Sequence, residues 1–469
     1  MIAYAIFAPL VSLLGFPLSF QRISLMDWQR ILQCGTVSLA VLVLAPSAAS
    51  FRFGQVYSAR PAQAIGWSVF FLLGFVSSTL ATYPRVAILE WSWTLLWFAA
   101  TALIALTARP KQEGLRDLVS TGVLGCLASY TAYFYLSNAE ALFDVDPILR
   151  MTYPGFSNVR ILSEFQIGLL FLIPWAIEYR VAAGIWRWCA WLLAGFFAAI
   201  VFTTGSRGLV MGLVVACIFL LLIAGRSAKP TLKAALRLGV LGAVVYALLF
   251  VLLPTGMQPP SASQDFARSG GSGREYLWQL AWGLAIEHPI LGIGPMHFAV
   301  GQNPFGASPH NHILQLLSEW GMPATLLFAV LIGAWAYGRL AVLRRQIFLA
   351  SDSGHCNFSL ASLGGLLSLF ALALVSPVFN NPTSQTMLSF FAILVNWSLP
   401  GRGSRSTGRL LPLVAIAGLV IFAWAVAPWL GWIEDRNACF FNSVTDSPVH
   451  VYWPRFWQQG WIIEPCEQF

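Results

Sequence analysis

Long apolar runs, separated by short polar stretches, follow one another along almost the whole chain. About 20 apolar residues in a row let a helix cross the ~30 Å hydrocarbon layer of a bilayer, and a backbone in lipid must satisfy its own hydrogen bonds. The pattern therefore predicts an all-α integral membrane protein, a polytopic bundle of about 12–13 transmembrane helices. The predicted spans are residues 1–20, 31–50, 64–82, 88–108, 118–138, 161–179, 188–204, 208–225, 236–254, 322–338, 358–376, 385–399 and 410–430.

Composition agrees with this pattern. Hydrophobic residues make up 58% of the chain and charged residues only 10%, whereas a soluble domain carries about a quarter charged residues. The run at 1–20 has the length of a signal peptide but lacks a basic n-region and a small-residue cleavage site, so we expect it to be retained. The sequence shows no repeat of fixed period, and we predict a single polytopic membrane domain over residues 1–469.

Basic residues indicate which side of the membrane each connection faces, because Lys and Arg accumulate in cytoplasmic loops. With the N-terminus in the cytoplasm, alternate connections hold most of the basic clusters and every lysine. These residues are Arg52, Arg60, Arg109, Lys111, Arg116, Arg180, Arg187, Arg226, Lys229, Lys233, Arg237, Arg339, Arg344, Arg345, Arg402, Arg405 and Arg409. The net charge of +8 then reflects membrane topology rather than nucleic-acid binding.

Three segments predicted on the outer side are longer than a turn: residues 139–160, 255–321 and a Trp-rich tail at 431–469. The segment 255–321 begins as a Pro/Ser/Gly-rich linker and continues as an amphipathic helix, so we predict a large helical periplasmic loop. The cysteines form no CxxC pair, which leaves thiolate metal binding unsupported. Only Cys439 and Cys466 share the outer tail, where an oxidising compartment would permit a disulfide.

Three arginines are predicted at the outer face of the membrane. Arg207 lies in a hairpin of about three residues between two apolar helices, where a charge usually faces a cavity or a polar partner. Arg274 opens the amphipathic helix, and Arg160 stands just before the sixth span. Together they would form a multidentate clamp for phosphate groups. The alternative is that Arg207 extends to the membrane surface and binds lipid phosphates.

Two of the six histidines, His310 and His312, lie one residue apart in the stretch SPHNHILQLLSEWG. Ser308 is a suitable N-cap and Pro309 a suitable first helical residue, which places His310 in the first turn of a helix. The positive helix end would keep its imidazole neutral and able to accept a proton as a general base. Metal binding by the two histidines, or an ordinary polar helix start, are the alternatives.

Several other polar residues accompany these groups. Glu319 follows the histidines on the same helical run, and it would orient His310 or lie solvated at the surface. Glu164 and Gln166 lie just inside the sixth span, where polar residues tend to mark a cavity. We predict that substrate contacts come from Arg160, Asn311, His312, Glu319 and Gln166.

Four motifs occur in order along the chain. They are GFSNVRILSEFQ at 155–166, TTGSRG at 203–208, the pair GREYLW and EHPILGIGP between 273 and 295, and His310-Asn311 followed by nine residues and Gly321. In these motifs, over about residues 155–345, the chain resembles the bacterial O-antigen ligase and O-antigen polymerase superfamily, polytopic glycan transferases of the GT-C type. One departure is Ala324, where the family often has Gly, Thr or Tyr.

The resemblance implies an enzyme, a metal-independent inverting glycosyltransferase with no cofactor. Its donor would be a glycan on undecaprenyl diphosphate, at the periplasmic side of the bacterial inner membrane. Carried over by motif, Arg207 and Arg274 would bind the diphosphate, with Arg160 assisting. His310 would take the proton of the acceptor hydroxyl. Membrane lipids would be further partners, and no metal or nucleic acid is implied.

The residues do not select the acceptor. Ligation of O-antigen to lipid A core is our first hypothesis. Polymerisation of O-antigen or exopolysaccharide, or transfer to a Ser/Thr hydroxyl of a protein such as pilin, are the alternatives. A transporter of lipid-linked glycans, with the arginines along its pathway, is a more distant alternative, because transporters commonly show internal repeats.

Overall fold

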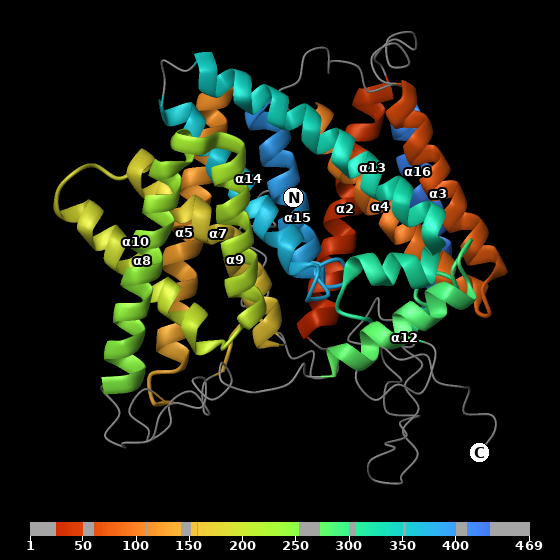
Figure 1. Ribbon diagram of the computed structural model, residues 1–469, viewed down its shortest axis with the longest axis horizontal. Helices are drawn as coiled ribbons and strands as arrows, with labels where there is room; N and C mark the ends of the chain where they lie inside the picture. Colours follow the sequence, from red (N-terminus) through yellow and green to blue (C-terminus); the bar gives the residue numbers. More distant parts are fainter. Residues whose placement is uncertain are drawn as a thin grey trace. The chain divides into compact units, whose positions relative to one another are not determined.

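The computed structural model describes residues 25–49, 61–107, 111–141, 152–156, 158–252, 273–299, 306–349, 353–399 and 410–431. Within these ranges every regular element is a helix, which confirms the predicted all-α class (Figure 1). The predicted span 1–20, the linker that precedes residue 273, and the tail with Cys439 and Cys466 lie outside the described residues.

Each predicted span from 31–50 onward coincides with a helix. Seven stretches within the described ranges are long and apolar enough to cross a membrane: Met26–Pro46, Ala62–Leu80, Pro84–Leu106, Val159–Arg180, Ile185–Thr203, Arg207–Leu252 and His312–Phe348. The stretch Arg207–Leu252 joins two of the predicted spans, and Asn357–Leu372 and Leu411–Ala427 are shorter apolar helices. The chain is therefore a multi-pass membrane protein, and a count of about 12–13 spans stays a prediction.

The chain divides into two compact units. Among the described residues, the first unit contains α5 (Gln112–Ser137), α7 (Val159–Arg180), α8 (Ile185–Thr203), α9 (Arg207–Ala224), η2 (Gly225–Ala228), α10 (Lys229–Tyr246), η3 (Ala247–Leu252), α14 (Ser353–Leu372) and α15 (Pro382–Ser398). The second contains α2 (Leu25–Ala49), α3 (Pro61–Leu80), α4 (Pro84–Thr107), α12 (Arg274–Glu287), η4 (His297–Ala299) and α16 (Leu410–Gly431). Helix α13 (His312–Leu349) passes from the second unit into the first at residues 338 and 339, and the single-domain organisation stays a prediction.

Helix α7 is the centre of the first unit. It is buried from Ile161 to Ile177 and packs against α5, α8, α10, α14 and α15. Glycines permit the close approach of its neighbours: a Cβ on Gly365 of α14 would lie 2.2 Å from the ring of Phe391, and one on Gly168 would lie 2.3 Å from the same ring. Small residues at helix contacts are typical of packing in membranes, where backbones must approach closely.

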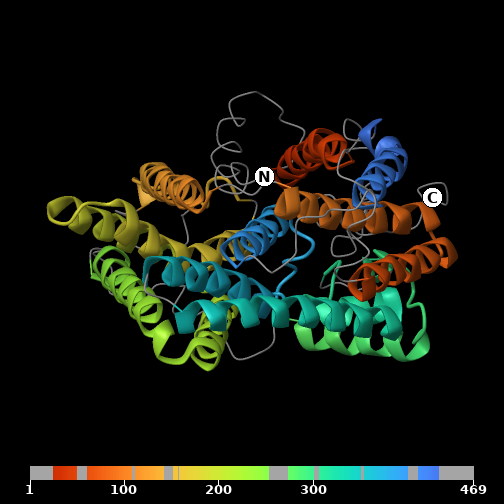
Figure 2. The same cartoon turned by 90° about the horizontal axis from the view of Figure 1, so that it is seen from above.

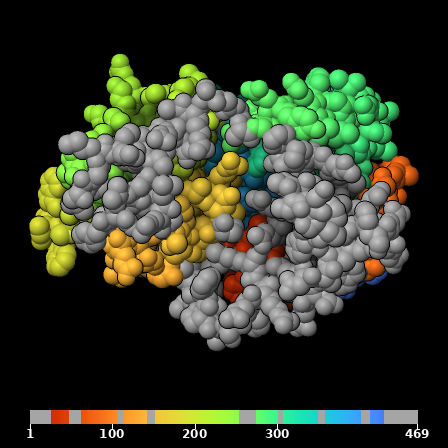
Figure 3. Space-filling view, turned by 90° about the horizontal axis from the view of Figure 1, so that it is seen from below, coloured from red at the N-terminus to blue at the C-terminus, as the bar shows by residue number. Residues whose placement is uncertain are grey.

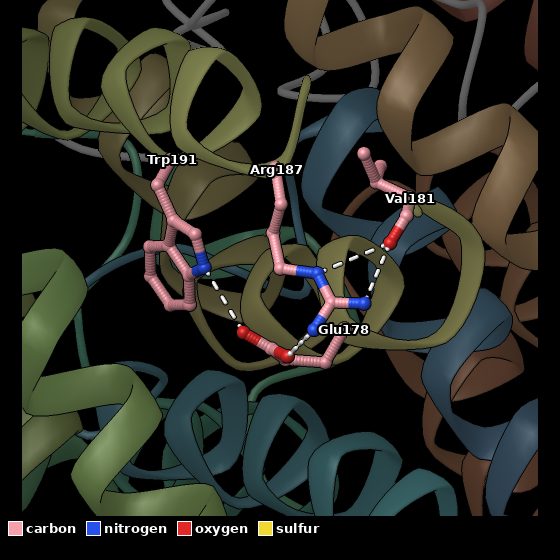
Figure 4. A network of polar contacts seen from close by, with 4 residues as sticks. All are labelled: Glu178, Val181, Arg187 and Trp191. Atoms are coloured by element: carbon pink, nitrogen blue, oxygen red, sulfur yellow. Dashed lines mark hydrogen bonds and ion pairs between the residues drawn. The ribbon is translucent and has the colours of Figure 1, made fainter. Parts of the chain in front are cut away.

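Connections predicted on one side of the membrane lie at the same end of the first unit. The Arg180 guanidinium donates to Asp117 Oδ1 over 2.9 Å, which joins the end of α7 to the second turn of α5. Arg187 bonds Glu178 and the carbonyl of Val181, and the Trp191 indole donates to Glu178 Oε1 (Figure 4). These partners close the turn between α7 and α8.

The second unit is rich in ring contacts. Trp320 stacks on Phe70 at 5.0 Å between ring centroids, and a Cβ on Gly74 of α3 would lie 2.1 Å from the Trp320 ring. Helix α12 lies alongside the first turns of α13 in both views (Figures 1 and 2). It buries Leu277 and Ala281 against Phe298, whereas its other face is at the surface, seen in green in Figure 3.

Candidate functional site

Helix α13 is broken at Gly321, where the backbone has φ 83° and ψ 169°, and Pro323 follows (Figure 1). Proline has no N–H to donate, and the break leaves the preceding carbonyls without helical partners. The segment 289–294 supplies those partners. Ile293 N donates to Ser318 O over 2.9 Å, Gly294 N donates to Glu319 O over 3.0 Å, and Met322 N donates to Pro289 O over 2.8 Å. Residues 289–294 and residues 318–322 thus form one backbone scaffold.

Glycines make this scaffold possible. Gly292 has φ 66°, and a Cβ there would lie 2.4 Å from the carbonyl carbon of Glu319. A Cβ on Gly321 would lie 2.2 Å from Ile290 O. The Ser77 hydroxyl on α3 stabilises the contact between these two segments, because it lies within hydrogen-bonding distance of a carbonyl in each: Leu291 O at 2.6 Å and Glu319 O at 3.1 Å. Only a residue without a side chain fits such a left-handed, closely packed position.

We expect Gly292→Ala to lower the free energy of unfolding by about 1–3 kcal/mol through backbone strain, with a further loss from the overlap with Glu319. The matched control is Gly283→Ala in α12, where a Cβ meets nothing within 4 Å. That change should leave stability unchanged or raise it by about 0.5–1 kcal/mol, because alanine favours a helix. Thermal unfolding of the purified protein in detergent measures both. Equal midpoints for the two variants would contradict the packing described above.

Two further buried side chains hold the turn that follows the glycines. Glu319 is fully buried, and its Oε1 accepts a hydrogen bond from Phe298 N over 2.9 Å. The His297 ring is buried, with Nε2 accepting from Tyr83 N and Nδ1 lying 2.9 Å from Pro295 O. Because Tyr83 N–H can only donate, the contacts favour a neutral ring with its proton on Nδ1. The contact with Tyr83 could not be predicted from the sequence, because the two residues lie 214 positions apart.

His310 lies just outside the helix, so the predicted cap at Ser308 and Pro309 is wrong. The N-cap is Asn311: its Oδ1 accepts from Ile313 N over 3.0 Å and Leu314 N over 3.2 Å, and its carbonyl accepts from Gln315 N. His310 has φ 53°, the left-handed region. Asparagine is as good a cap as serine, and a left-handed residue before it redirects the chain into the helix.

The surroundings of His310 come from α12 and the preceding turn. The Trp278 indole donates to Pro309 O over 2.9 Å, which ties the peptide before His310 to α12. A Cβ on Gly306 would lie 3.3 Å from His310 Nε2, so this nitrogen faces the backbone of residue 306. His310 is half-buried. The peptide before His310 is thus tied to α12, and the half-buried imidazole lies beside residue 306.

His312, the first residue of α13, is half-buried and meets the ring of Phe328 edge-on at 5.7 Å between centroids. Among the described residues there is no group of three or more His, Cys, Asp or Glu side chains that would hold a metal ion.

Each of the three arginines stands at the start of a helix. Arg274 is the first residue of α12 and is half-buried; Arg207 is the first residue of α9 and is exposed. The predicted hairpin before Arg207 is confirmed, with Ser206 as N-cap accepting from Leu209 N. Arg160 is exposed in the first turn of α7, one residue inside the helix rather than before it.

The candidate residues fall in both units. Arg274, His310, Asn311, His312 and Glu319 belong to the second unit, where α12 and α13 lie together. Arg160, Gln166 and Arg207 belong to the first. Gln166 is fully buried, and its amide donates to Phe197 O over 3.4 Å. Its Oε1 accepts no hydrogen bond from the part of the chain that the structure describes.

Glu164 lies one turn after Arg160 on α7 and has three side-chain hydrogen-bond donors around it. It is almost completely buried in α7 and accepts hydrogen bonds from Ser376 Oγ, from Ser384 Oγ and, over 2.9 Å, from Asn381 Nδ2. The polar position inside an apolar span was visible in the sequence. Its partners, more than 200 residues further along the chain, were not.

Comparison with known families finds one domain. Residues 191–329 match the family model Wzy_C, described as O-antigen ligase. The matched range contains Arg207, Arg274, His310 and Gly321, whereas Arg160 and Glu164 precede it. No curated protein matches the chain.

Proposed function

We propose that this chain transfers a lipid-linked glycan to an acceptor hydroxyl, as an enzyme of the O-antigen ligase and O-antigen polymerase superfamily; the match of residues 191–329 to the O-antigen ligase family model supports this proposal. The observation that carries the proposal is the backbone scaffold of residues 289–294 and 318–322. Residues 318–322 continue the helix that begins directly after Asn311, and Trp278 of α12 donates to the carbonyl of Pro309, next to His310. A half-buried imidazole on a rigid support suits a group that must meet a substrate in one orientation.

The donor in this proposal is a glycan on undecaprenyl diphosphate. Arg207 and Arg274 bind its diphosphate, and Arg160 assists. The positions of these residues support the assignment, because each lies in the first turn of a helix. The N–H groups and dipole of a helix N-terminus attract anions, and a guanidinium adds charge-assisted, bidentate hydrogen bonds to phosphate oxygens.

His310 acts as the general base in the proposed reaction. It takes the proton of the acceptor hydroxyl while the hydroxyl oxygen attacks the anomeric carbon of the donor sugar. A new C–O bond forms as the bond from the anomeric carbon to the diphosphate breaks, with inversion at that carbon. Undecaprenyl diphosphate leaves, and the arginines stabilise the charge that develops on it. No metal takes part in these steps.

The acceptor we propose is lipid A core, with the reaction on the periplasmic side of the inner membrane. A deletion strain tests this choice through an electrophoretic profile of its envelope glycans. Lipopolysaccharide reduced to bare core, with polymer accumulating on the lipid carrier, supports ligation. Core bearing one repeat unit instead indicates a polymerase. An unchanged ladder excludes both and directs the search to protein glycosylation, such as that of pilins.

A further inference from the structure

The Glu164 carboxylate accepts hydrogen bonds from the connection between α14 and α15 (residues 373–381) and from the first turn of α15. Its three donors are Ser376 and Asn381 in that connection and Ser384 in the first turn of α15. The connection itself is tightly turned, with Val378 N donating to Ser376 O and Asn381 N to Pro377 O. It therefore has few ways to move while the carboxylate holds its ends.

The same connection supports the start of α9. A Cβ on Gly208 would lie 3.1 Å from Leu372 Cδ1 and 3.2 Å from Val375 Cγ2. Gly208 directly follows Arg207, and Val375 directly precedes Ser376. One short chain of contacts therefore runs from the Glu164 carboxylate, through residues 372–376, to the backbone that carries Arg207.

Arg160 is linked to Glu164 more simply. The two residues are four apart on α7, so their side chains project from the same face of the helix, one turn from each other. Arg160 is exposed where Glu164 is buried. Glu164 is held in place by its three side-chain donors, Ser376, Asn381 and Ser384.

We propose that Glu164 is a positioning residue, which holds Arg160 and the start of α9 in the arrangement that binds a lipid diphosphate. Glu164 itself does not touch the substrate. This inference rests on the proposed function, since it takes Arg160 and Arg207 as ligands of the diphosphate. It adds a residue outside the matched family range to the machinery of donor binding.

The test compares three variants of the full-length protein in liposomes, with undecaprenyl diphosphate as the binding probe. Glu164→Gln replaces one carboxylate oxygen, which accepts hydrogen bonds, by an amide NH2 group, which can only donate. That NH2 group would face the donors of Ser376, Asn381 and Ser384. Glu164→Gln combined with Asn381→Asp exchanges the amide and the carboxylate and restores a hydrogen bond between them. Glu178→Gln is the matched control, because it removes a carboxylate at the other end of the same helix (Figure 4).

We expect Glu164→Gln to weaken binding of undecaprenyl diphosphate, and to raise the KM for the lipid-linked donor, by roughly tenfold. The kcat should change less, since the reacting groups remain. The exchanged pair should recover most of the loss, and Glu178→Gln should bind like the wild type. If Glu164→Gln does not fold, Ser384→Ala, which removes one donor, should show a smaller effect in the same direction.

The outcomes separate this inference from the proposed function. A Glu164→Gln protein with a lower melting temperature but wild-type binding and KM would overturn the positioning role and leave a purely structural one. An exchanged pair no better than the single variant would overturn the hydrogen-bond account. A wild-type protein that neither binds undecaprenyl diphosphate nor transfers a glycan would overturn the proposed function, and the inference with it.

Discussion

His310→Ala is expected to lower glycan transfer by about 100- to 10,000-fold, the usual contribution of a positioned general base. The variant should still be inserted in the membrane at wild-type level, because His310 is half-buried and precedes the helix rather than forming part of it. Transfer is measured with purified protein in liposomes and a lipid-linked donor, and membrane insertion by quantifying the protein in isolated membranes.

The left-handed backbone at residue 310 calls for a second variant. Alanine disfavours φ 53°, so His310→Ala changes the backbone as well as the base. Asparagine adopts the left-handed region readily and is polar, but it cannot take up the proton. We expect His310→Asn to be as inactive as His310→Ala. If His310→Asn transfers glycan at the wild-type rate, backbone geometry is what matters and the base must be sought elsewhere.

Two controls complete this experiment. His288→Asn changes an exposed histidine at the end of α12 and should transfer glycan within about twofold of the wild type, as surface substitutions usually do. The wild type should also keep its activity in a strong chelator. Loss of transfer under chelation, with recovery on adding a divalent metal, would assign His310 and His312 to a metal instead.

Much of the fold was predictable because its signals are local. An apolar run of the right length forms a helix wherever it meets lipid, so every predicted span within the described residues coincides with one. The start of α9 at Arg207 and of α12 at Arg274 followed from the same local patterns. Each of these features depends only on residues next to one another in sequence.

The parts that could not be predicted depend on distant partners. Ser308 and Asn311 are equally suitable caps, and Asn311 is the cap in a segment where Trp278 of α12 bonds Pro309 O. The helix break at Gly321 is stable because residues 289–294 take its unpaired carbonyls, a pairing that no sequence pattern displays. Glu164 likewise looked like an isolated polar residue in an apolar span.

The arginines provide the second large effect. We expect Arg207→Ala and Arg274→Ala each to lower transfer by about 100- to 1,000-fold, because a preorganised group that stabilises developing charge in a transition state is worth that much. Arg207→Lys and Arg274→Lys should recover only part of the loss, since lysine restores the charge but not the planar fork that binds two phosphate oxygens. Arg344→Ala, which changes an exposed arginine of α13, is the control and should transfer glycan normally.

The double variant tests whether the two arginines serve one diphosphate. If Arg207 and Arg274 bind the same group, removing the second after the first should cost less than it does alone, because residues that act as a unit are not additive. Independent sites would instead give the product of the two losses. Wild-type transfer in either alanine variant would remove that arginine from the clamp. Residual binding of undecaprenyl diphosphate by the double variant would then measure what the helix N-termini contribute without their guanidinium groups.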